Sequence, residues 1–282
     1  MKKKTKKRLA TILKFLLKLI FYYPFKFLWY IITKIYSFFK NKYNTHKQTS
    51  LQTKANQSRT SATYDHFHEL KKITGTLHEF EQKIIKNKST IGIILGARGT
   101  GKSALAMRLL ENIATQTNKQ AYAMGFSSTS LPAWIQPITT TDDITNNSII
   151  IIDESGISFS SRSSMSSSSK LLSALLLIAR HKDLSVIFIT QNSANLEINA
   201  IRQADYLLLK PSSLLQKDFE RKKIQEIYEQ AQSDFDLFKS HRGLTYIYAD
   251  NYRGFVTNTL PNFWSENLSK SFAQHQNKES SR

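Results

Sequence analysis

The sequence predicts an α/β domain with a mainly parallel sheet flanked by helices, preceded by a basic, amphipathic N-terminal segment. Two apolar runs, Ile91–Leu95 and Ser148–Asp153, have the composition of buried strands. The second contains four consecutive isoleucines, which suits a central strand covered on both faces. Strand-like runs alternate with helix-like stretches over residues 88–210, as in a doubly wound parallel sheet.

The stretch Gly96–Ser103 follows the first strand and matches the pattern G-x-x-x-x-G-K-[ST] at every fixed position. A helix is expected over Ser103–Ile113, so the strand, loop and helix occur in the order that this motif requires. Glycines allow backbone N–H groups to converge on phosphate oxygens, and the helix N-terminus adds positive potential. The expected nucleotide-binding residues are Gly96, Ala97, Arg98, Gly99, Thr100, Gly101, Lys102, Ser103 and Ala104.

Within this loop, Lys102 is expected to reach the β- and γ-phosphates of ATP, and the Ser103 hydroxyl to bind Mg²⁺. Asp153 and Glu154 end the isoleucine strand, where P-loop ATPases place a second motif. Asp153 is expected to hold Mg²⁺, mainly through water, and Glu154 to activate the attacking water. An acidic pair at a helix N-terminus is the alternative interpretation.

Gln191 follows a further strand-like run, Ser185–Thr190. A polar amide at the tip of a buried strand can sense the γ-phosphate or position water. Alternatively, it caps the following turn. The helix expected over Leu171–Ala179 leads into this strand through Arg180, and a short helix over Asn195–Arg202 leads into a strand over Asp205–Pro211.

Composition narrows the classes of protein that this chain can be. It has 282 residues and no cysteine, which excludes disulfides, thiolate zinc sites and cysteine nucleophiles. Its net charge is +19, and residues 1–64 hold 15 Lys and Arg without any Asp or Glu. The high charge therefore describes the N-terminal part more than the catalytic part.

The N-terminal segment combines lysines with apolar and aromatic residues. Lysines interrupt the apolar stretch Leu9–Phe39, so no run approaches the ~20 apolar residues of a membrane span. Their spacing predicts two basic amphipathic helices hinged near Pro24, which would lie on an anionic bilayer surface. A tilted or re-entrant span with snorkelling lysines is the main alternative, and a helical hairpin packed on protein is another.

The remaining segments are less regular. Residues 41–63 are polar and are expected to form a linker, and Asp65–Lys86 is expected to be helical with a break near Gly75. The serine-rich stretch Ser155–Lys170 predicts a mobile loop, either a plain connector or a loop that touches polymer in a ring's channel. A charged helix is expected over Asp218–Gln232. A hairpin around Asp250-Asn251 should add an antiparallel edge to the sheet.

The expected domain boundaries are a membrane-associated segment (1–45), a linker and helical lead-in (46–87), a nucleotide-hydrolysing domain (88–266) and a polar tail (267–282).

The successive motifs GARGTGKS, IIIIDES, ARHKDLSVIFITQ and IRQAD resemble the FtsK/HerA superfamily of P-loop ATPases. The resemblance covers residues 90–210. It points to the branch of zonula occludens toxin-like proteins, filamentous-phage assembly ATPases and viral genome-packaging ATPases. It implies a RecA-like core that assembles into a ring, often hexameric. By this resemblance Arg180, with Arg202 second, is a candidate arginine finger for a neighbour's nucleotide. Either arginine could instead be structural.

With the basic amphipathic segment 1–45 and the phosphate-loop motif, the resemblance leads us to expect a membrane-associated ring ATPase that uses ATP and Mg²⁺ to move double-stranded DNA, in viral packaging or in transfer across a membrane. The alternatives are an ATPase that powers assembly or export of protein subunits, and a tethered nucleotide-dependent scaffold that moves nothing. The ATPase domain is expected in the cytoplasm or at a virion membrane vertex.

Overall fold

The computed structural model describes residues 29–30, 33–34, 36–37, 40, 60–126, 131–153, 164–265 and 268. It divides the chain into two compact units, Met1–Asn56 and Gln57–Arg282. In the first unit the described residues are helical, and the Thr33 hydroxyl donates to the Tyr30 carbonyl at 2.9 Å. No helix among the described residues is long and apolar enough to cross a membrane. The predictions for residues 1–45 fall mostly outside the described residues.

The second unit is built on one sheet, whose described part has nine strands in the order β1-β9-β8-β7-β2-β6-β5-β3-β4. The six strands from β7 to β4 are parallel, and β8, β9 and β1 add an antiparallel extension. The strands are β1 His68–Gly75, β2 Ile91–Leu95, β3 Gln120–Met124, β4 Ile135–Ile138, β5 Ser148–Asp153, β6 Leu184–Thr190, β7 Tyr206–Leu209, β8 Thr245–Ala249 and β9 Tyr252–Thr257.

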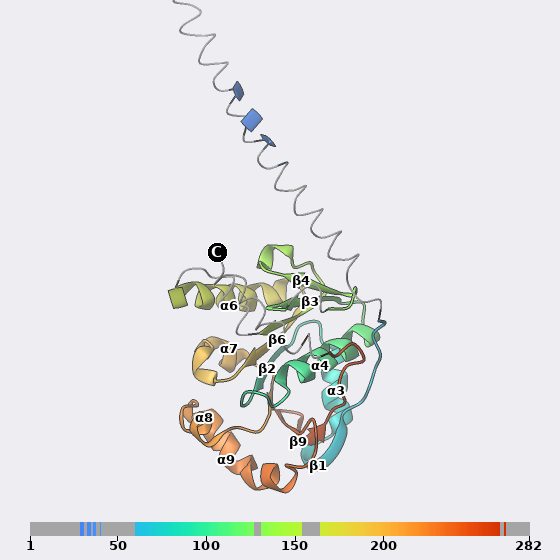
Figure 1. The fold of residues 1–282 in the computed structure, drawn as a ribbon, viewed down its shortest axis with the longest axis vertical. Helices are drawn as coiled ribbons and strands as arrows, with labels where there is room; N and C mark the ends of the chain where they lie inside the picture. Colours follow the sequence, from blue (N-terminus) through green and yellow to red (C-terminus); the bar gives the residue numbers. More distant parts are fainter. Residues whose placement is uncertain are drawn as a thin grey trace, which may run out of the picture. The chain divides into compact units, whose positions relative to one another are not determined.

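Helices cover both faces of this sheet, with α3 and α4 on one side and α6 to α9 on the other (Figure 1). The helices are α3 Leu77–Lys86, α4 Lys102–Gln116, α6 Ser164–His181, α7 Ile198–Gln203, α8 Leu214–Asp218 and α9 Lys222–Leu237, with 3₁₀ turns η3 Thr141–Asp143 and η4 Ser193–Asn195. The prediction of an α/β domain with a mainly parallel sheet is therefore confirmed.

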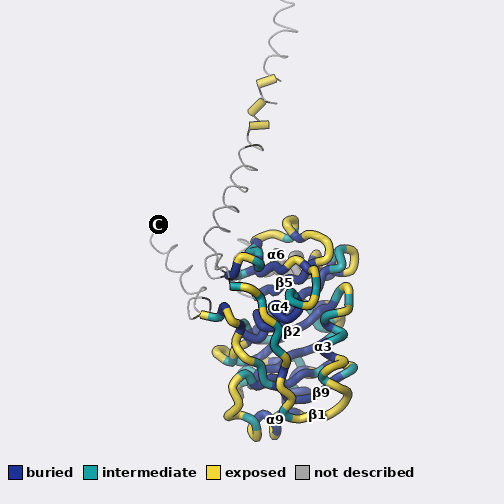
Figure 2. The backbone as a smooth tube through the Cα atoms, turned by 90° about the vertical axis from the view of Figure 1, so that its right-hand side faces the viewer, coloured by how far each residue is buried: buried dark blue, intermediate teal, exposed yellow. Residues whose placement is uncertain are grey.

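The isoleucines of β5 show why this strand is central. Ile149 and Ile151 pack toward α3 and α4, whereas Ile150 and Ile152 pack toward the opposite layer, and all four are 0% exposed. Because side chains alternate along a strand, only a sheet covered on both faces can bury four consecutive apolar residues. Figure 2 shows the central strands β2 and β5 as part of the buried interior of the unit.

The prediction of a helix over Asp65–Lys86 is wrong for the first half of this segment, because His68–Gly75 forms the strand β1. β1 pairs antiparallel with β9, about 180 residues later, and the Lys71 ammonium bonds Asp234 of α9 at 2.7 Å. Most side chains of β1 are exposed, so the segment carries little of the apolar alternation that marks a strand. Pairing with a distant strand decides its structure. Helix α3 confirms the second half of the expectation.

Two further boundaries differ from those expected. Helix α6 begins at Ser164, so the expected loop is wrong for residues 164–170, while residues 155–163 lie outside the described residues. Serine is a moderate helix former, and each residue added to an existing helix gains one backbone hydrogen bond. The helix expected from Asp218 begins instead at Lys222, because Glu220 and Arg221 bond Ser193 rather than continue a helix.

The hairpin around Asp250-Asn251 is confirmed as β8 and β9. It does not end the sheet as expected, because β1 pairs with its outer strand.

Candidate functional site

The loop between β2 and α4 has the backbone that a phosphate-binding loop needs. Gly96, Gly99 and Gly101 have φ of +153°, +79° and +86°. A Cβ at Gly96 would lie 2.5 Å from the Cβ of Lys210, so a larger residue would force the loop away from β7. The Ala97 amide donates to the Pro211 carbonyl at 3.1 Å, which fixes the start of the loop to the segment after β7.

Lys102 begins α4 and is 8% exposed. Its ammonium donates to the Gly96 carbonyl at 2.8 Å and to the Ala97 carbonyl at 2.9 Å. The positive charge is therefore held inside the curve of the loop. This is the place where a bound polyphosphate would require it.

The other predicted loop residues occupy the positions that the motif implies. The Thr100 hydroxyl donates to the Ala97 carbonyl at 2.7 Å and stabilises the loop's turn. The side chain of Arg98 is exposed at the tip of the loop, and Ala104 is buried within α4.

The loop and the acidic strand β5 come together across β6, which lies between β2 and β5. The Ser103 hydroxyl donates to Asp153 Oδ2 at 3.3 Å. A hydroxyl and a carboxylate side by side are hard oxygen ligands that suit Mg²⁺. Among the described residues no group of three or more His, Asp or Glu side chains could hold a metal.

Gln191 immediately follows β6, at the same edge of the sheet. In the parallel register, Leu95 of β2 lies beside Thr190, and Asp153 of β5 lies beside Ile189. Gln191 therefore stands between the phosphate loop and the acidic strand end. Glu154, the next residue after Asp153, lies outside the described residues, and its role stays a prediction.

Arg180 and Arg202 are exposed and lie at the opposite edge of the sheet from the phosphate loop. Arg180 is in the last turn of α6 and Arg202 in that of α7, each just before the amino end of the next strand. The phosphate loop lies at the carboxyl ends of the parallel strands, about 20 Å away along the seven residues of β6. Neither arginine can reach the nucleotide site of its own chain.

Residues that were not predicted from the sequence bond the loop after β6 and fix its position. Glu220 is 6% exposed and accepts from the Ser193 amide at 2.8 Å. The Arg221 guanidinium donates to the carbonyls of Ser193 at 3.1 Å and Leu196 at 2.8 Å. The Gln216 amide nitrogen donates to the Gln191 carbonyl. The junction of α8 and α9 thus positions the candidate sensor Gln191.

The sequence analysis also did not identify Lys210, although its position at the end of the apolar strand β7 could have indicated a buried lysine. It is 1% exposed, and its ammonium donates to the Gly243 carbonyl at 2.8 Å. Burial lowers the pKa of Lys210 to about 7. The Cβ and the backbone carbonyl of Lys210 lie against Gly96, so the residue supports the phosphate loop through its backbone side, while its ammonium bonds Gly243.

We expect Lys210→Met to flatten the dependence of stability on pH. Between pH 7 and 10.5 the unfolded chain binds one more proton at Lys210 than the folded chain does. The free energy of unfolding of the wild type should therefore rise with pH, by up to about 1.4 kcal/mol per pH unit from this group. Urea denaturation at pH 7, 8 and 9 measures it, with Lys239→Met as the control that removes an exposed lysine. Parallel curves for wild type and Lys210→Met would contradict the assignment.

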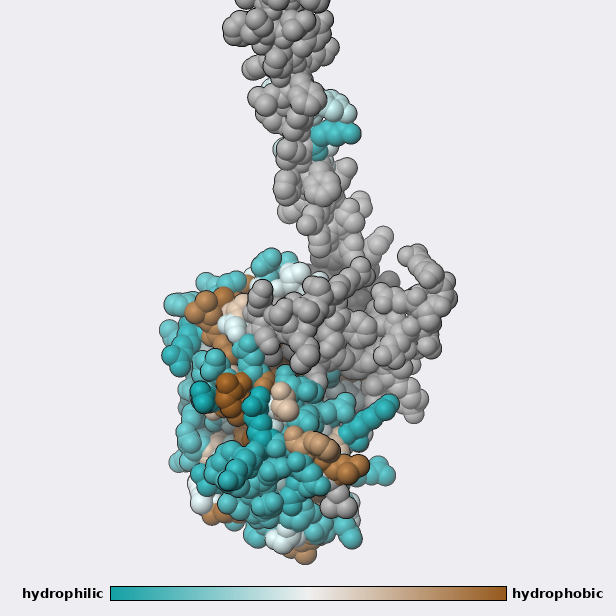
Figure 3. Space-filling model, turned by 90° about the vertical axis from the view of Figure 1, so that its left-hand side faces the viewer, coloured by the Kyte–Doolittle hydropathy of each residue, from teal (hydrophilic) through white to brown (hydrophobic). Residues whose placement is uncertain are grey.

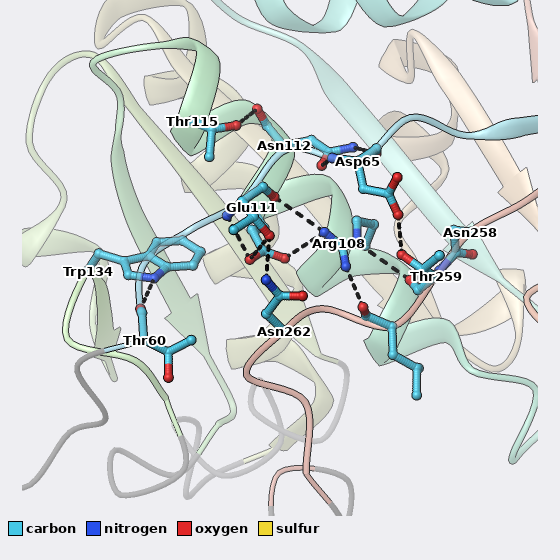
Figure 4. A network of polar contacts seen from close by, with 12 residues as sticks. Thr60, Asp65, Arg108, Glu111, Asn112, Thr115, Trp134, Asn258, Thr259 and Asn262 are labelled. Atoms are coloured by element: carbon cyan, nitrogen blue, oxygen red, sulfur yellow. Dashed lines mark hydrogen bonds and ion pairs between the residues drawn. The ribbon is translucent and has the colours of Figure 1, made fainter.

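A polar network joins α4, the helix of the phosphate loop, to the segments on either side of it (Figure 4). Arg108 and Glu111 form an ion pair at 2.9 Å, with side chains 2% and 0% exposed. Glu111 Oε1 accepts from the Thr63 amide at 3.0 Å, and Arg108 donates to the carbonyls of Thr63, Thr259 and Leu260. The chain that leads into β1 and the chain that leaves β9 are therefore both fixed to α4.

Breaking this ion pair should cost much of the domain's stability. Arg108→Met leaves the Glu111 carboxylate buried without its cation, so we expect a loss of about 3–5 kcal/mol in the free energy of unfolding. The double variant Arg108→Met/Glu111→Leu removes both charges and should recover much of that loss. Denaturant unfolding of the two variants measures both effects. A single-variant loss below about 1 kcal/mol would show that the pair is solvated.

No family model matches the chain, and no curated protein matches it. Similar solved structures include the genome packaging NTPase B204 from Sulfolobus turreted icosahedral virus 2 in complex with ATP-gammaS, at 15% identity and a TM-score of 0.40, covering 62% of this chain and 100% of that one. They include the pCW3 conjugation coupling protein TcpA with ATPgS, at 11% identity and a TM-score of 0.42, covering 68% of this chain and 66% of that one.

The N-terminal domain of zonular occludens toxin from Neisseria meningitidis is also similar, at 17% identity and a TM-score of 0.30, covering 43% of this chain and 76% of that one. Genome-packaging and zonula occludens toxin-like proteins are also groups that the sequence resemblance named. Because these identities and TM-scores are low, the function is argued from this chain's own residues.

Proposed function

We propose that this chain is an ATP-driven DNA translocase that works as a membrane-associated ring. The observation that carries its ATPase chemistry is the contact of Ser103 Oγ with Asp153 Oδ2 at 3.3 Å. That contact joins the phosphate loop to the acidic strand at the carboxyl edge of the sheet. This is the edge where ligands bind in open α/β sheets.

Each residue of the site has a distinct role in hydrolysis. Lys102 neutralises phosphate charge, and Ser103 and Asp153 hold Mg²⁺. When bound, Mg²⁺ would offset the negative charge of the phosphates. Glu154 accepts the proton of the attacking water, and Gln191 orients that water. The exposed position of Arg180, one strand length from its own site, supports a role at the nucleotide of a neighbouring subunit.

Double-stranded DNA is the polymer that the sequence resemblance favours. The test is the steady-state rate of ATP hydrolysis by the full chain with and without duplex DNA, with Lys102→Ala as the control. Stimulation by DNA supports the proposal. Stimulation by a co-purifying protein instead would indicate an ATPase that assembles or exports protein subunits.

The membrane part of the proposal rests on residues 1–45, whose lysines alternate with an apolar and aromatic face. These residues fused to a soluble reporter should sediment with vesicles that contain anionic lipid. Release by high salt or carbonate would favour helices that lie on the surface, whose attraction is about 1 kcal/mol per basic residue. Resistance to the wash would favour a spanning or re-entrant segment. A reporter that stays in solution would contradict membrane association of residues 1–45.

A further inference from the structure

The segment between β7 and α9 connects the phosphate loop to the loop that carries Gln191. At its start, the Pro211 carbonyl accepts from the Ala97 amide of the phosphate loop at 3.1 Å. Five residues later, the side-chain amide of Gln216 in α8 donates to the Gln191 carbonyl. In the sheet, β7 and β6 lie on either side of β2, which leads into the phosphate loop. Residues 211–220 therefore pass from one side of the phosphate loop to the other.

Helix α8 owes little of its position to the two large apolar side chains that it exposes. Leu215 and Phe219 lie four residues apart on one face of the helix, and they are 73% and 71% exposed. Figure 3 views the side on which Figure 1 shows α6, α7 and α8, and it shows separate hydrophobic patches on a largely hydrophilic surface. The polar side chain of Gln216 points instead toward the domain, where it bonds the Gln191 loop and Glu220. Polar contacts of α8 thus bear directly on the place of that loop.

Glu220 fixes the orientation of the Gln216 amide. Glu220 is 6% exposed, and its carboxylate accepts from the Gln216 side-chain nitrogen at 3.1 Å and from the Ser193 amide at 2.8 Å. A carboxylate and a backbone carbonyl only accept hydrogen bonds, so both partners of Gln216 require its NH₂ group rather than its oxygen. The direction of the bond from Gln216 to Gln191 is therefore determined by the residues around it.

We propose that Gln216 is a positioning residue for ATP hydrolysis, which holds Gln191 at a fixed place beside the phosphate loop. This inference rests on the proposed function, in which Gln191 orients the attacking water. The bond is made to the backbone of Gln191, so Gln216 sets the place of the residue without using its side-chain amide. A displacement of about 1 Å in such a site can slow a reaction by as much as about 10²-fold.

Gln216→Met tests this role, because methionine has a similar length and removes the donor. We expect ATP affinity to stay unchanged, since the phosphate loop is intact, and the rate of hydrolysis to fall about tenfold or more. The steady-state rate of the full chain without DNA and the binding of a fluorescent ATP analogue measure the two effects. The matched control is Gln225→Met, which should keep the wild-type rate. Gln225 also bonds α8, at the Lys217 and Asp218 carbonyls, but its bonds do not go to the Gln191 loop.

A double-mutant cycle shows whether Gln216 acts through Gln191. Gln191→Ala should lower the rate by itself. Adding Gln216→Met to Gln191→Ala should cause no further loss, because no side-chain amide is left to be placed. A merely structural role of Gln216 would instead lower the rate by the same factor in both backgrounds.

Five outcomes would overturn the inference. They are full activity of Gln216→Met, an equal loss in Gln225→Met, losses that multiply in the cycle, weaker ATP binding at an unchanged maximal rate, and normal turnover by Gln191→Ala. The assay contains no DNA, so it is separate from the test of translocation. A protein that DNA does not stimulate, but that Gln216→Met slows as expected, would support this inference and reject only the translocase. DNA-stimulated hydrolysis that Gln216→Met leaves unchanged would reject only this inference.

Discussion

Arg180→Ala is expected to leave ATP affinity unchanged and to lower the rate of hydrolysis about 10³-fold or more. An arginine supplied by a neighbouring subunit stabilises charge that develops on the phosphates in the transition state, and contributes little to ground-state binding. Its place at the amino edge, one strand length from its own phosphate loop, allows no role at its own nucleotide. Binding of a fluorescent ATP analogue and the steady-state rate measure the two effects separately.

A mixture of variants tests whether Arg180 acts between subunits. Lys102→Ala removes the phosphate-binding cation, and Arg180→Ala removes the arginine, so each protein alone is inactive. In mixed assemblies some sites combine an intact loop with an intact arginine, and activity should return. Arg202→Ala is the comparison, since Arg202 is also exposed at the amino edge. Co-assembled mixtures that stay inactive would show that Arg180 has a structural role.

Glu154→Gln is expected to keep ATP bound and to slow hydrolysis roughly 10²-fold or more. The amide keeps the size of the side chain but cannot accept the proton of the attacking water. Single-turnover hydrolysis measures this effect, and Glu229→Gln, which changes an exposed carboxylate of α9, is the control. Normal turnover by Glu154→Gln would move the role of general base to another residue.

The central part of the fold could be predicted because its signals are local. The strand β2, the glycine loop and α4 are adjacent in the chain, and each is determined by residues within it. The four isoleucines of β5 indicate a central strand because burial on both faces is visible in composition. The carboxyl ends of parallel strands share one edge, so the meeting of Ser103 with Asp153 also follows from the predicted strands.

The parts that could not be predicted depend on distant pairs. β1 has few apolar residues, and it forms a strand because it pairs with β9. The exposed Lys71 of β1 forms an ion pair with Asp234 of α9. The break between α8 and α9 depends on Ser193, which lies on another loop. The Arg108–Glu111 pair looks like an ordinary pair on a helix surface until the segments around it cover both side chains. Such contacts leave no periodic pattern in the sequence.

The central claim is that hydrolysis moves the chain along duplex DNA. The most direct measurement is the release of a labelled third strand from a DNA triplex, because a protein that advances along the duplex displaces it. We expect release that requires ATP, is absent with a non-hydrolysable analogue, and is lost in Lys102→Ala. DNA-stimulated hydrolysis without release of the third strand would contradict translocation.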